Sequence, residues 1–220
     1  GGVTQMKMRN NEPEFVTFNT ENGLKSDYVY ATYPDSQNNI WIATDGGGIA
    51  VIEDGKSRTI RNELTDSIGK VVYSIAEDAK GNIWFGTSDN GLIRFDGTDY
   101  MHFTKKDGLS SNDIKSIVGY PENHILGAHI NEIDIINNNN FSVTNIGQLL
   151  ALKDFVPNLN AFHIDEQNNL FIGTGNGILK ANFTKEDLKL KPRLFISRKQ
   201  VHYKDIKKGK KEFSHKDNNL

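Results

Sequence analysis

Short apolar runs alternate with polar turns along most of the chain, and one such phrase recurs. The segment GNIWFGTSDNGLIRFDG at residues 81–97 closely matches NNIWIATDGGGIAVIEDG at 38–55, and a more divergent copy, NNLFIGTGNGILKANF, lies at 168–183. Apolar runs of about four to eight residues bounded by Gly, Asn and Asp are typical of β-strands joined by tight turns. Helical periodicity is hard to find, so we expect an all-β protein built from repeats.

A large apolar residue marks the same position in four copies of the repeat. These anchors, at spacings of 43, 42 and 45 residues, are Trp41, Trp84, Leu126 and Phe171. Six residues before them, at the start of a turn rich in Asn and Gly, lie Asp35, Asp78, Tyr120 and Asp165. Asn and Gly tolerate the positive φ of a tight hairpin, and an Asp side chain can cap such a turn. The pattern therefore predicts a hairpin before each anchor.

One full unit contains four apolar segments, which predicts four antiparallel strands. A four-stranded unit of about 40 to 45 residues has the period of a β-propeller blade. The expected blades span about residues 18–61, 62–103, 104–145 and 151–190. Since one blade cannot bury both of its faces alone, we expect Trp41 and Trp84 to be core residues between blades and not ligand platforms.

Residues 15–18, FVTF, precede the first complete unit and fit the outer strand of a preceding blade. Two interpretations stay open at this point. Either the four blades close tightly on themselves, or further blades or a second copy of the chain cover the exposed edges.

The lead-in and hairpin together resemble a known family. NGLKSDYVYATYPDSQNNIWIATDGGGIAVIEDG and DGLSSNDIKSIVGYPENHILGAH resemble the two-component regulator propeller repeat, with its GL lead-in, its Asp-x-x-Gly-Asn turn and its W-x-G-T strand. This resemblance covers most of residues 15–190 and implies a larger propeller, usually of seven blades. The segment at 192–220 looks like the start of the small β-sandwich domain that follows such propellers, so 191–220 is expected to be a truncated second domain.

The resemblance also implies a function. In that family the propeller is the periplasmic sensor region of a hybrid histidine kinase in a two-component system, and the ligands are often oligosaccharides. We therefore expect a non-catalytic, ligand-sensing segment without a cofactor, connected to a membrane only through flanking segments. Two alternatives remain: a propeller enzyme such as a lyase, and a protein-interaction scaffold.

Composition excludes several other classes. Hydrophobic residues make up 36% and charged residues 25% of the 220 residues, which is ordinary for a globular protein. Cysteine is absent, which excludes disulfides, thiol nucleophiles and Cys-ligated zinc. The net charge is −2, but residues 191–220 carry +7, so the rest of the chain is acidic. An acidic body argues against binding to nucleic acid.

In a propeller, the lead-in to the inner strand and the turn between the second and third strands share one face. Side chains there offer the carboxylates, amides and aromatic ring that sugar hydroxyls require. The candidate ligand-binding residues are Tyr28, Asp45, Asp89, Asn112, His129 and Asn176. His129 replaces a Thr that recurs in the other repeats, and in the lyase alternative it would act with channel acids. No catalytic motif and no metal-ligand spacing is found.

Overall fold

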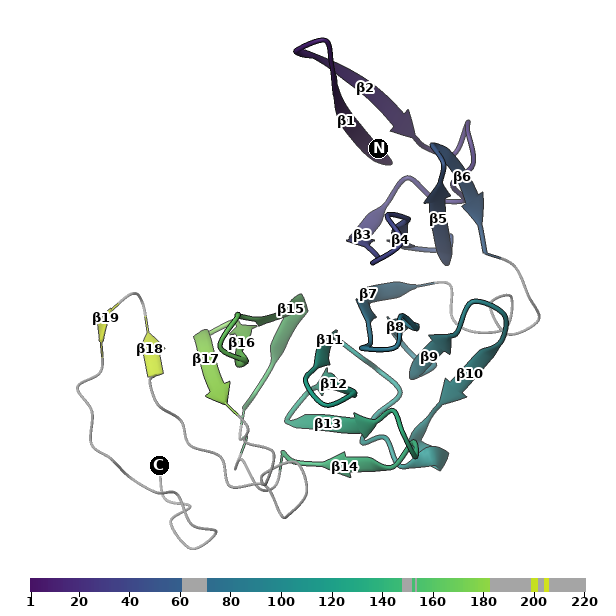
Figure 1. Ribbon diagram of the computed structural model, residues 1–220. Helices are drawn as coiled ribbons and strands as arrows, with labels where there is room; N and C mark the ends of the chain where they lie inside the picture. Colours follow the sequence, from purple (N-terminus) through teal and green to yellow (C-terminus); the bar gives the residue numbers. More distant parts are fainter. Residues whose placement is uncertain (61–70, 148–151, 153, 183–198, 202–203, 206–220) are drawn as a thin grey trace, which may run out of the picture.

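The computed structural model describes residues 1–60, 71–147, 152, 154–182, 199–201 and 204–205. An N-terminal hairpin is followed by four antiparallel sheets, which succeed one another along the chain in an open arc (Figure 1). Each sheet has its strands in sequence order, so each is formed by one contiguous segment. This arrangement confirms the all-β prediction, with four strands in each of the first three sheets and five in the fourth.

The strands of the hairpin are β1 (Val3–Arg9) and β2 (Glu12–Phe18). The first sheet contains β3 (Val29–Pro34), β4 (Ile40–Thr44), β5 (Ile49–Glu53) and β6 (Lys56–Thr59). The second contains β7 (Val72–Glu77), β8 (Ile83–Thr87), β9 (Leu92–Phe95) and β10 (Tyr100–Phe103).

A short 3-10 helix, η1 (Lys105–Asp107), leads into the third sheet. That sheet contains β11 (Ser116–Tyr120), β12 (His124–His129), β13 (Glu132–Asn137) and β14 (Val143–Asn145). The fourth contains β15 (Pro157–Ile164), β16 (Asn169–Thr174), β17 (Gly177–Asn182), β18 (Lys199–Val201) and β19 (Lys204–Asp205).

The turn between the first and second strands is built around the repeated aspartate. In the second sheet, Asp78 Oδ1 accepts the backbone N–H groups of Lys80 and Asn82 at 2.9 and 3.0 Å, and Asp78 Oδ2 accepts Trp84 Nε1–H at 3.0 Å. Asp35 makes the same set of bonds, with Trp41 Nε1 at 2.8 Å. The aspartate therefore ties the turn to the large side chain of the second strand.

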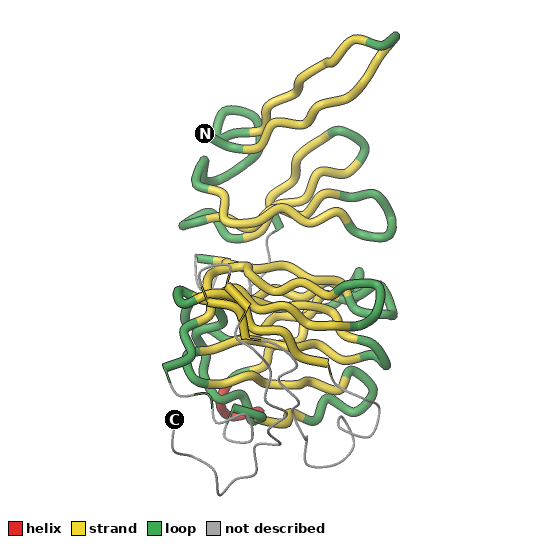
Figure 2. Tube along the Cα trace, turned by 90° about the vertical axis from the view of Figure 1, so that its left-hand side faces the viewer, coloured by secondary structure: helices red, strands yellow, loops and turns green. Residues whose placement is uncertain are grey.

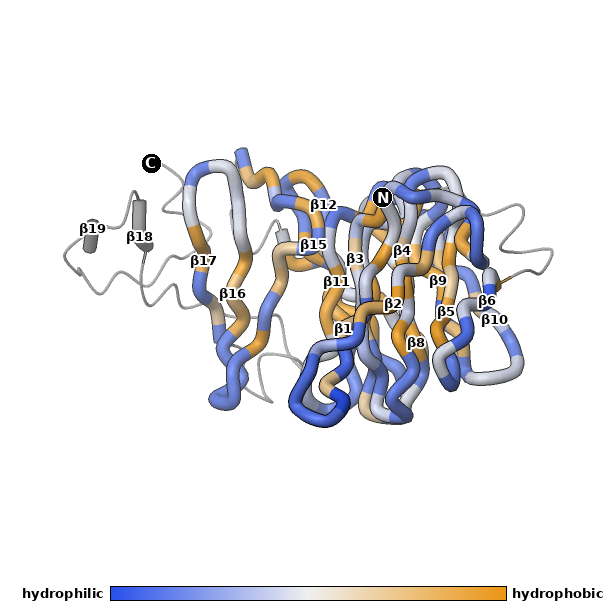
Figure 3. The backbone as a smooth tube through the Cα atoms, turned by 90° about the horizontal axis from the view of Figure 1, so that it is seen from above, coloured by the Kyte–Doolittle hydropathy of each residue, from blue (hydrophilic) through white to orange (hydrophobic). Residues whose placement is uncertain are grey.

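The tryptophan anchors pack between sheets, as the sequence predicts. Trp41 contacts Phe85 and Phe95 of the second sheet, with ring centroids 5.5 and 5.7 Å apart. Trp84 stacks on Phe103 at 5.3 Å within a cluster that extends into the third sheet. Both indoles are buried. Figure 2 shows the sheets stacked along the arc, and in Figure 3 the strands are largely hydrophobic in colour, while the turns at both ends are hydrophilic.

Side-chain oxygens link the inner strands β7, β11 and β15. Ser74 Oγ accepts the N–H of Ile117 at 3.1 Å, and Ser116 Oγ accepts the N–H of Phe162 at 3.0 Å. Neighbouring inner strands do not pair as a continuous sheet, so these serines satisfy backbone donors that would otherwise be buried without partners.

The N-terminal hairpin packs against the first sheet only at its base, where β1 begins and β2 ends. Phe18 is buried there beside Leu24 and Ile42. Further along, Met6 and Phe15 pair across the hairpin and are 59% and 64% exposed. Residues 15–18, expected to be the outer strand of a preceding blade, are the end of β2, which pairs with β1 throughout.

Two short strands within the range expected for the sandwich domain pair with the fourth sheet. β18 pairs with β17 through Gln200 opposite Ile178 and Lys199 opposite Leu179, and β19 pairs with β18. Without β18, the third strand of this sheet, β17, would have an unpaired edge, and β18 supplies hydrogen-bond partners for that edge. Residues 191–198, 202–203 and 206–220 lie outside the described residues, so the sandwich stays a prediction. Within the described part of the chain, no helix has the length and apolar character to cross a membrane.

Candidate ligand-binding site

The inner strands are irregular at one repeated position. Tyr30 and Tyr73 each lie eleven residues before a tryptophan anchor. The register of β3 against β4 shifts between Val29 and Ala31, and that of β7 against β8 shifts between Val72 and Ser74. Each tyrosine is therefore the extra residue of a β-bulge. Bulges re-aim a side chain out of the regular alternation and are common beside binding sites.

The third and fourth repeats place polar residues at the same offset. Lys115 and Asn160 lie eleven residues before Leu126 and Phe171. Asn160 lies within another register shift, and its φ of 50° is in the left-handed region. We call Tyr30, Tyr73, Lys115 and Asn160 the bulge cluster.

Members of the bulge cluster contact one another across sheets. The rings of Tyr30 and Tyr73 meet edge to face, with centroids 5.1 Å apart and planes at 83°. Lys115 Nζ lies 5.4 Å from the centroid of the Tyr73 ring, within the range of a cation–π contact. Asn160 N–H donates to the carbonyl of Lys115 at 2.9 Å, and Asn160 Oδ1 accepts from Ser74 Oγ at 2.8 Å. Four repeats thus contribute to one contiguous polar and aromatic surface.

Two carboxylates border the bulge cluster. Asp45 Oδ2 accepts the hydroxyl of Tyr30 at 3.3 Å, and Asp113 Oδ2 lies 2.8 Å from Lys115 Nζ. Partial desolvation raises the pKa of Tyr30, and the charge of Asp45 raises it further, so the phenol remains a donor at neutral pH. Tyr28, two residues before Tyr30, is 78% exposed.

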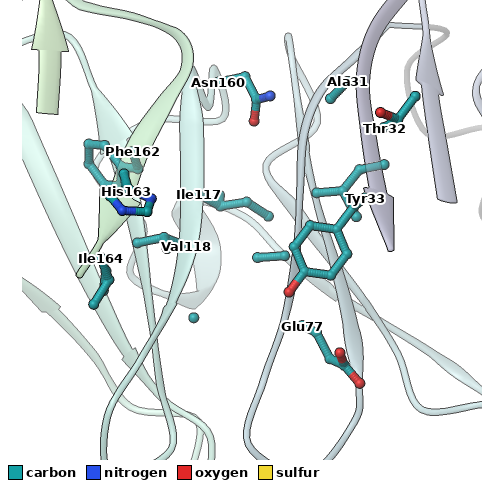
Figure 4. A pocket seen from close by; sticks show the side chains of 13 residues that line it. Ala31, Thr32, Tyr33, Glu77, Ile117, Val118, Asn160, Phe162, His163 and Ile164 are labelled. Atoms are coloured by element: carbon teal, nitrogen blue, oxygen red, sulfur yellow. The ribbon is translucent and has the colours of Figure 1, made fainter. Parts of the chain in front are cut away.

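A cavity of about 400 Å³ lies among the inner strands (Figure 4). Its lining comes from β3, β7, β11 and β15 and includes Tyr33, Glu77, Asn160, Phe162 and His163. Because Asn160 belongs to both the lining and the bulge cluster, the cavity adjoins that cluster. Glu77 accepts the backbone N–H and the hydroxyl of Ser36 at 2.9 and 2.5 Å, which holds its carboxylate in place.

The structure brings some of the sequence-predicted residues together. The N–H of Asp45 donates to the carbonyl of Tyr28 at 2.9 Å, so these two lie side by side next to Tyr30. The carbonyl of Asn112 accepts the N–H of Gly91 at 2.7 Å, which places its loop against the turn that carries Asp89. The lead-in and the turn therefore do meet on one face.

Two of the predicted residues, Asn112 and Asn176, have local roles in their own loops. Asn112 Oδ1 accepts the N–H of Lys105 at 2.9 Å and so stabilises its own loop, as Asp27 does with Thr20 in the first repeat. Asn176 is exposed in the turn after β16, where its N–H donates to Thr174 Oγ1 at 3.3 Å.

His129 is buried, with its Nε2 2.6 Å from Asp134 Oδ2. This contact is close but not aligned as a hydrogen bond. A His129 side chain so enclosed does not reach a ligand at the surface.

Sequence reasoning missed Tyr30, Tyr73, Lys115 and Asn160, although a signal was present. All four share one offset from the anchors, and a comparison of the repeats eleven residues upstream would have aligned them. The bulges themselves carry no obvious sequence mark, because Tyr and Asn are compatible with ordinary strands and turns. Within the described residues, no group of three or more His, Cys, Asp or Glu side chains could hold a metal ion.

A family profile described as two component regulator propeller matches residues 23–46 and 66–89. These ranges contain the inner strand and the tryptophan anchor of the first two sheets. No curated protein sequence matches the chain.

Solved structures match the fold over most of the chain. The extracellular domain of the hybrid two-component system BT3049 from B. thetaiotaomicron superposes with a TM-score of 0.71 and 18% identity, over 93% of this chain and 29% of that domain. The extracellular domain of BT4673 from the same organism superposes with a TM-score of 0.62 and 22% identity, over 79% of this chain and 25% of that domain. Virginiamycin B lyase from Staphylococcus aureus superposes with a TM-score of 0.60 and 16% identity, over 80% of this chain and 59% of the lyase.

The chain thus spans less than a third of the length of the two extracellular domains it matches. At these identities the structural likeness shows the fold, and the profile match independently shows the repeat type. The chain carries two-component regulator propeller repeats and has the β-propeller fold of the extracellular domains of Bacteroides hybrid two-component systems.

Proposed function

We propose that this chain is a ligand-sensing part of the periplasmic region of a two-component system sensor, and that the bulge cluster binds a carbohydrate-derived signal without turnover. The family profile and the two extracellular domains with the same fold support the sensor class. The chemistry of the bulge cluster supports the ligand class.

One observation carries the ligand proposal: two tyrosines, a lysine and an asparagine from four repeats form one contiguous cluster beside a cavity. Tyr28, Tyr30 and Tyr73 offer ring faces and edges to the C–H surface of a sugar. Asp45 and Asn160 offer acceptors, and Asn160 also offers donors, to sugar hydroxyls. An apolar surface with a few fixed polar groups is typical of small-molecule sites.

The arrangement also suggests how binding could be signalled. The cluster draws its members from β3, β7 and β15 and from Lys115 directly before β11, so a ligand that touches several of them binds best at one relative position of these strands. A ligand shifts a conformational equilibrium only by its unequal affinity for the two states. Signalling therefore requires that occupancy of the cluster favour one packing of the repeats.

The lyase alternative has less support. It would need an exposed acid–base group near the ligand, and His129, the histidine considered for that role, is buried against Asp134. We therefore propose that this segment does not catalyse a reaction.

Calorimetric titration of the purified chain with a panel of plant and host oligosaccharides tests the proposal. We expect saturable binding and a higher melting temperature with the ligand, because a ligand of the folded state stabilises it. Tyr30→Ala and Tyr73→Ala should each weaken binding at least tenfold. Met101→Ala, on the outer strand β10, is the matched control and should not.

Chromatography of the same sugars after incubation separates binding from turnover. Conversion of a bound sugar would overturn the sensor proposal in favour of an enzyme. Binding that survives both tyrosine substitutions would show that the ligand lies elsewhere.

A further inference from the structure

We propose that the ligand presents an uncharged surface to the bulge cluster, and that Asp45 excludes sugars bearing a carboxylate or sulfate. This inference rests on the proposed function, because it concerns the ligand of that same site. It follows from the charged side chains at the cluster: Lys115 is paired with a carboxylate, whereas Asp45 is paired with no cation.

The only cation of the bulge cluster is already engaged. Lys115 Nζ lies 2.8 Å from Asp113 Oδ2, and the two side chains are only 21% and 37% exposed. The same ammonium lies over the Tyr73 ring at 5.4 Å. To bind an anionic sugar, Lys115 would have to give up the Asp113 carboxylate, which would then be left beside the incoming anion. Lys115 is therefore not a ready anchor for an anion.

Asp45 has no such compensation. Its side chain accepts the Tyr30 hydroxyl at 3.3 Å, and it takes part in none of the ion pairs of the described residues. The group of Asp45, Asp113 and Lys115 carries a formal charge of −1. A neutral sugar hydroxyl can donate to the free acceptor positions of Asp45, whereas an anion at that place is repelled.

The adjoining cavity adds no permanent positive charge to offset this. Its thirteen lining residues include one carboxylate, Glu77, and one histidine, His163, but neither Lys nor Arg. The described arginines are held elsewhere: Arg9, Arg58 and Arg94 pair with Glu14, Glu53 and Asp96. No described arginine therefore serves as the fork that usually binds carboxylate or sulfate groups.

Matched sugar pairs test the inference. Each uronate-containing oligosaccharide is compared with its carboxyl-reduced counterpart, which keeps the same linkages and length but loses the charge. Binding of both members is measured on a glycan array, and every hit is confirmed by calorimetry at low and moderate salt. We expect the reduced member to bind at least tenfold more tightly, with a larger ratio at low salt because screening is weaker there.

Substitution of Asp45 tests whether this residue causes the preference for the uncharged sugar. Asp45→Asn keeps the size and one acceptor of the side chain but removes its charge, and it should reduce the ratio between the two members at least threefold. Asp99→Asn, in the exposed turn between β9 and β10, is the matched control and should leave the ratio unchanged.

The outcomes are distinguishable. If acidic members bind as tightly as their reduced counterparts or more tightly, this inference is overturned while the proposed carbohydrate sensing stands. If the ratio is the same in Asp45→Asn and in the unaltered chain, the role of Asp45 is overturned. Absence of binding to every sugar of either kind would overturn the proposed function together with this inference.

Discussion

The imidazole of His129 and the carboxylate of Asp134 form a buried pair, with Nε2 and Oδ2 2.6 Å apart. Asp134 also accepts the N–H and hydroxyl of Ser110, at 2.9 and 2.6 Å, and the amide of Asn145 at 2.6 Å. His129 Nδ1 in turn lies 3.2 Å from the carbonyl of Asp113. The pair thus connects the lead-in loop of the third repeat to β12, β13 and β14.

Loss of the Asp134 charge should destabilise the protein. Asp134→Asn leaves His129 and Ser110 without their carboxylate, and breaking a buried pair of this kind costs about 3 kcal/mol. The measurement is urea unfolding at pH 7, with Asp99→Asn as a control that should change little. A variant as stable as the unaltered chain would contradict the structural role of the pair.

The same carboxylate should make stability depend on pH. Burial by itself would raise the pKa of Asp134, but contacts with His129 and Ser110 outweigh it and lower the pKa. A lowered pKa means that the stabilisation is present above the ordinary value near 3.8 and is lost as the pH falls through the folded-state value. The stability difference between the unaltered chain and Asp134→Asn should therefore shrink below about pH 4.

The two tryptophan anchors should differ in their sensitivity to loss of the indole N–H. Trp84→Phe leaves the buried Asp78 carboxylate one donor short, which should cost about 2 kcal/mol in the free energy of unfolding. Trp41→Phe should cost less, because Asp35 is partly exposed and water can replace the lost donor. Denaturant unfolding of both variants provides the comparison, and a larger loss for Trp41→Phe would contradict this account.

Two glycines at the same repeat position should respond differently to alanine. Gly48 and Gly91 have φ of 71° and 75°, so alanine is strained at both, by about 1 kcal/mol. A Cβ on Gly91 would also lie 2.1 Å from the carbonyl oxygen of Phe103, whereas a Cβ on Gly48 would meet nothing within 4 Å. Thermal unfolding should show a clearly larger loss for Gly91→Ala, and equal losses would refute the predicted clash.

Tyr100 should be a late-titrating tyrosine. Desolvation raises its pKa to about 12, where it stacks on Phe95 with centroids 4.6 Å apart. Because the neutral phenol is the favoured form in the folded state, its contribution to stability is present below about pH 10 and is lost as the pH rises toward 12. Absorbance titration at alkaline pH should show a component near 12 that disappears in Tyr100→Phe, and its persistence there would assign it to another residue.

The repeated elements could be predicted because each depends on local chemistry. An aspartate six residues before a tryptophan, with an intervening Asn, is sufficient for a hairpin whose bonds all lie within one segment. The bulky apolar anchors predict burial between repeats for the same reason, since a sheet must cover its apolar face. The strand order and the positions of Trp41 and Trp84 accordingly follow from the sequence.

The candidate site was only partly predictable. Tyr28 and Asp45 are neighbours as expected from their loops, but the contact between Tyr30 and Tyr73 joins two different repeats. Similarly, replacement of a repeated Thr by His129 suggested a ligand-facing group, whereas Asp134 on the next strand encloses it. Such outcomes depend on which side chain lies opposite in space, and the repeat alone does not encode that.

The sequence by itself determined the all-β repeat, its turns and its anchors, because backbone conformation and apolar patterning act over a few residues. Only the tertiary structure decided that three β-bulges and Lys115 converge on one surface, that Lys115 is neutralised by Asp113 while Asp45 is not, and that β18 continues the fourth sheet. The physical reason is that charge compensation and edge pairing depend on distances between strands that the curvature of the arc sets.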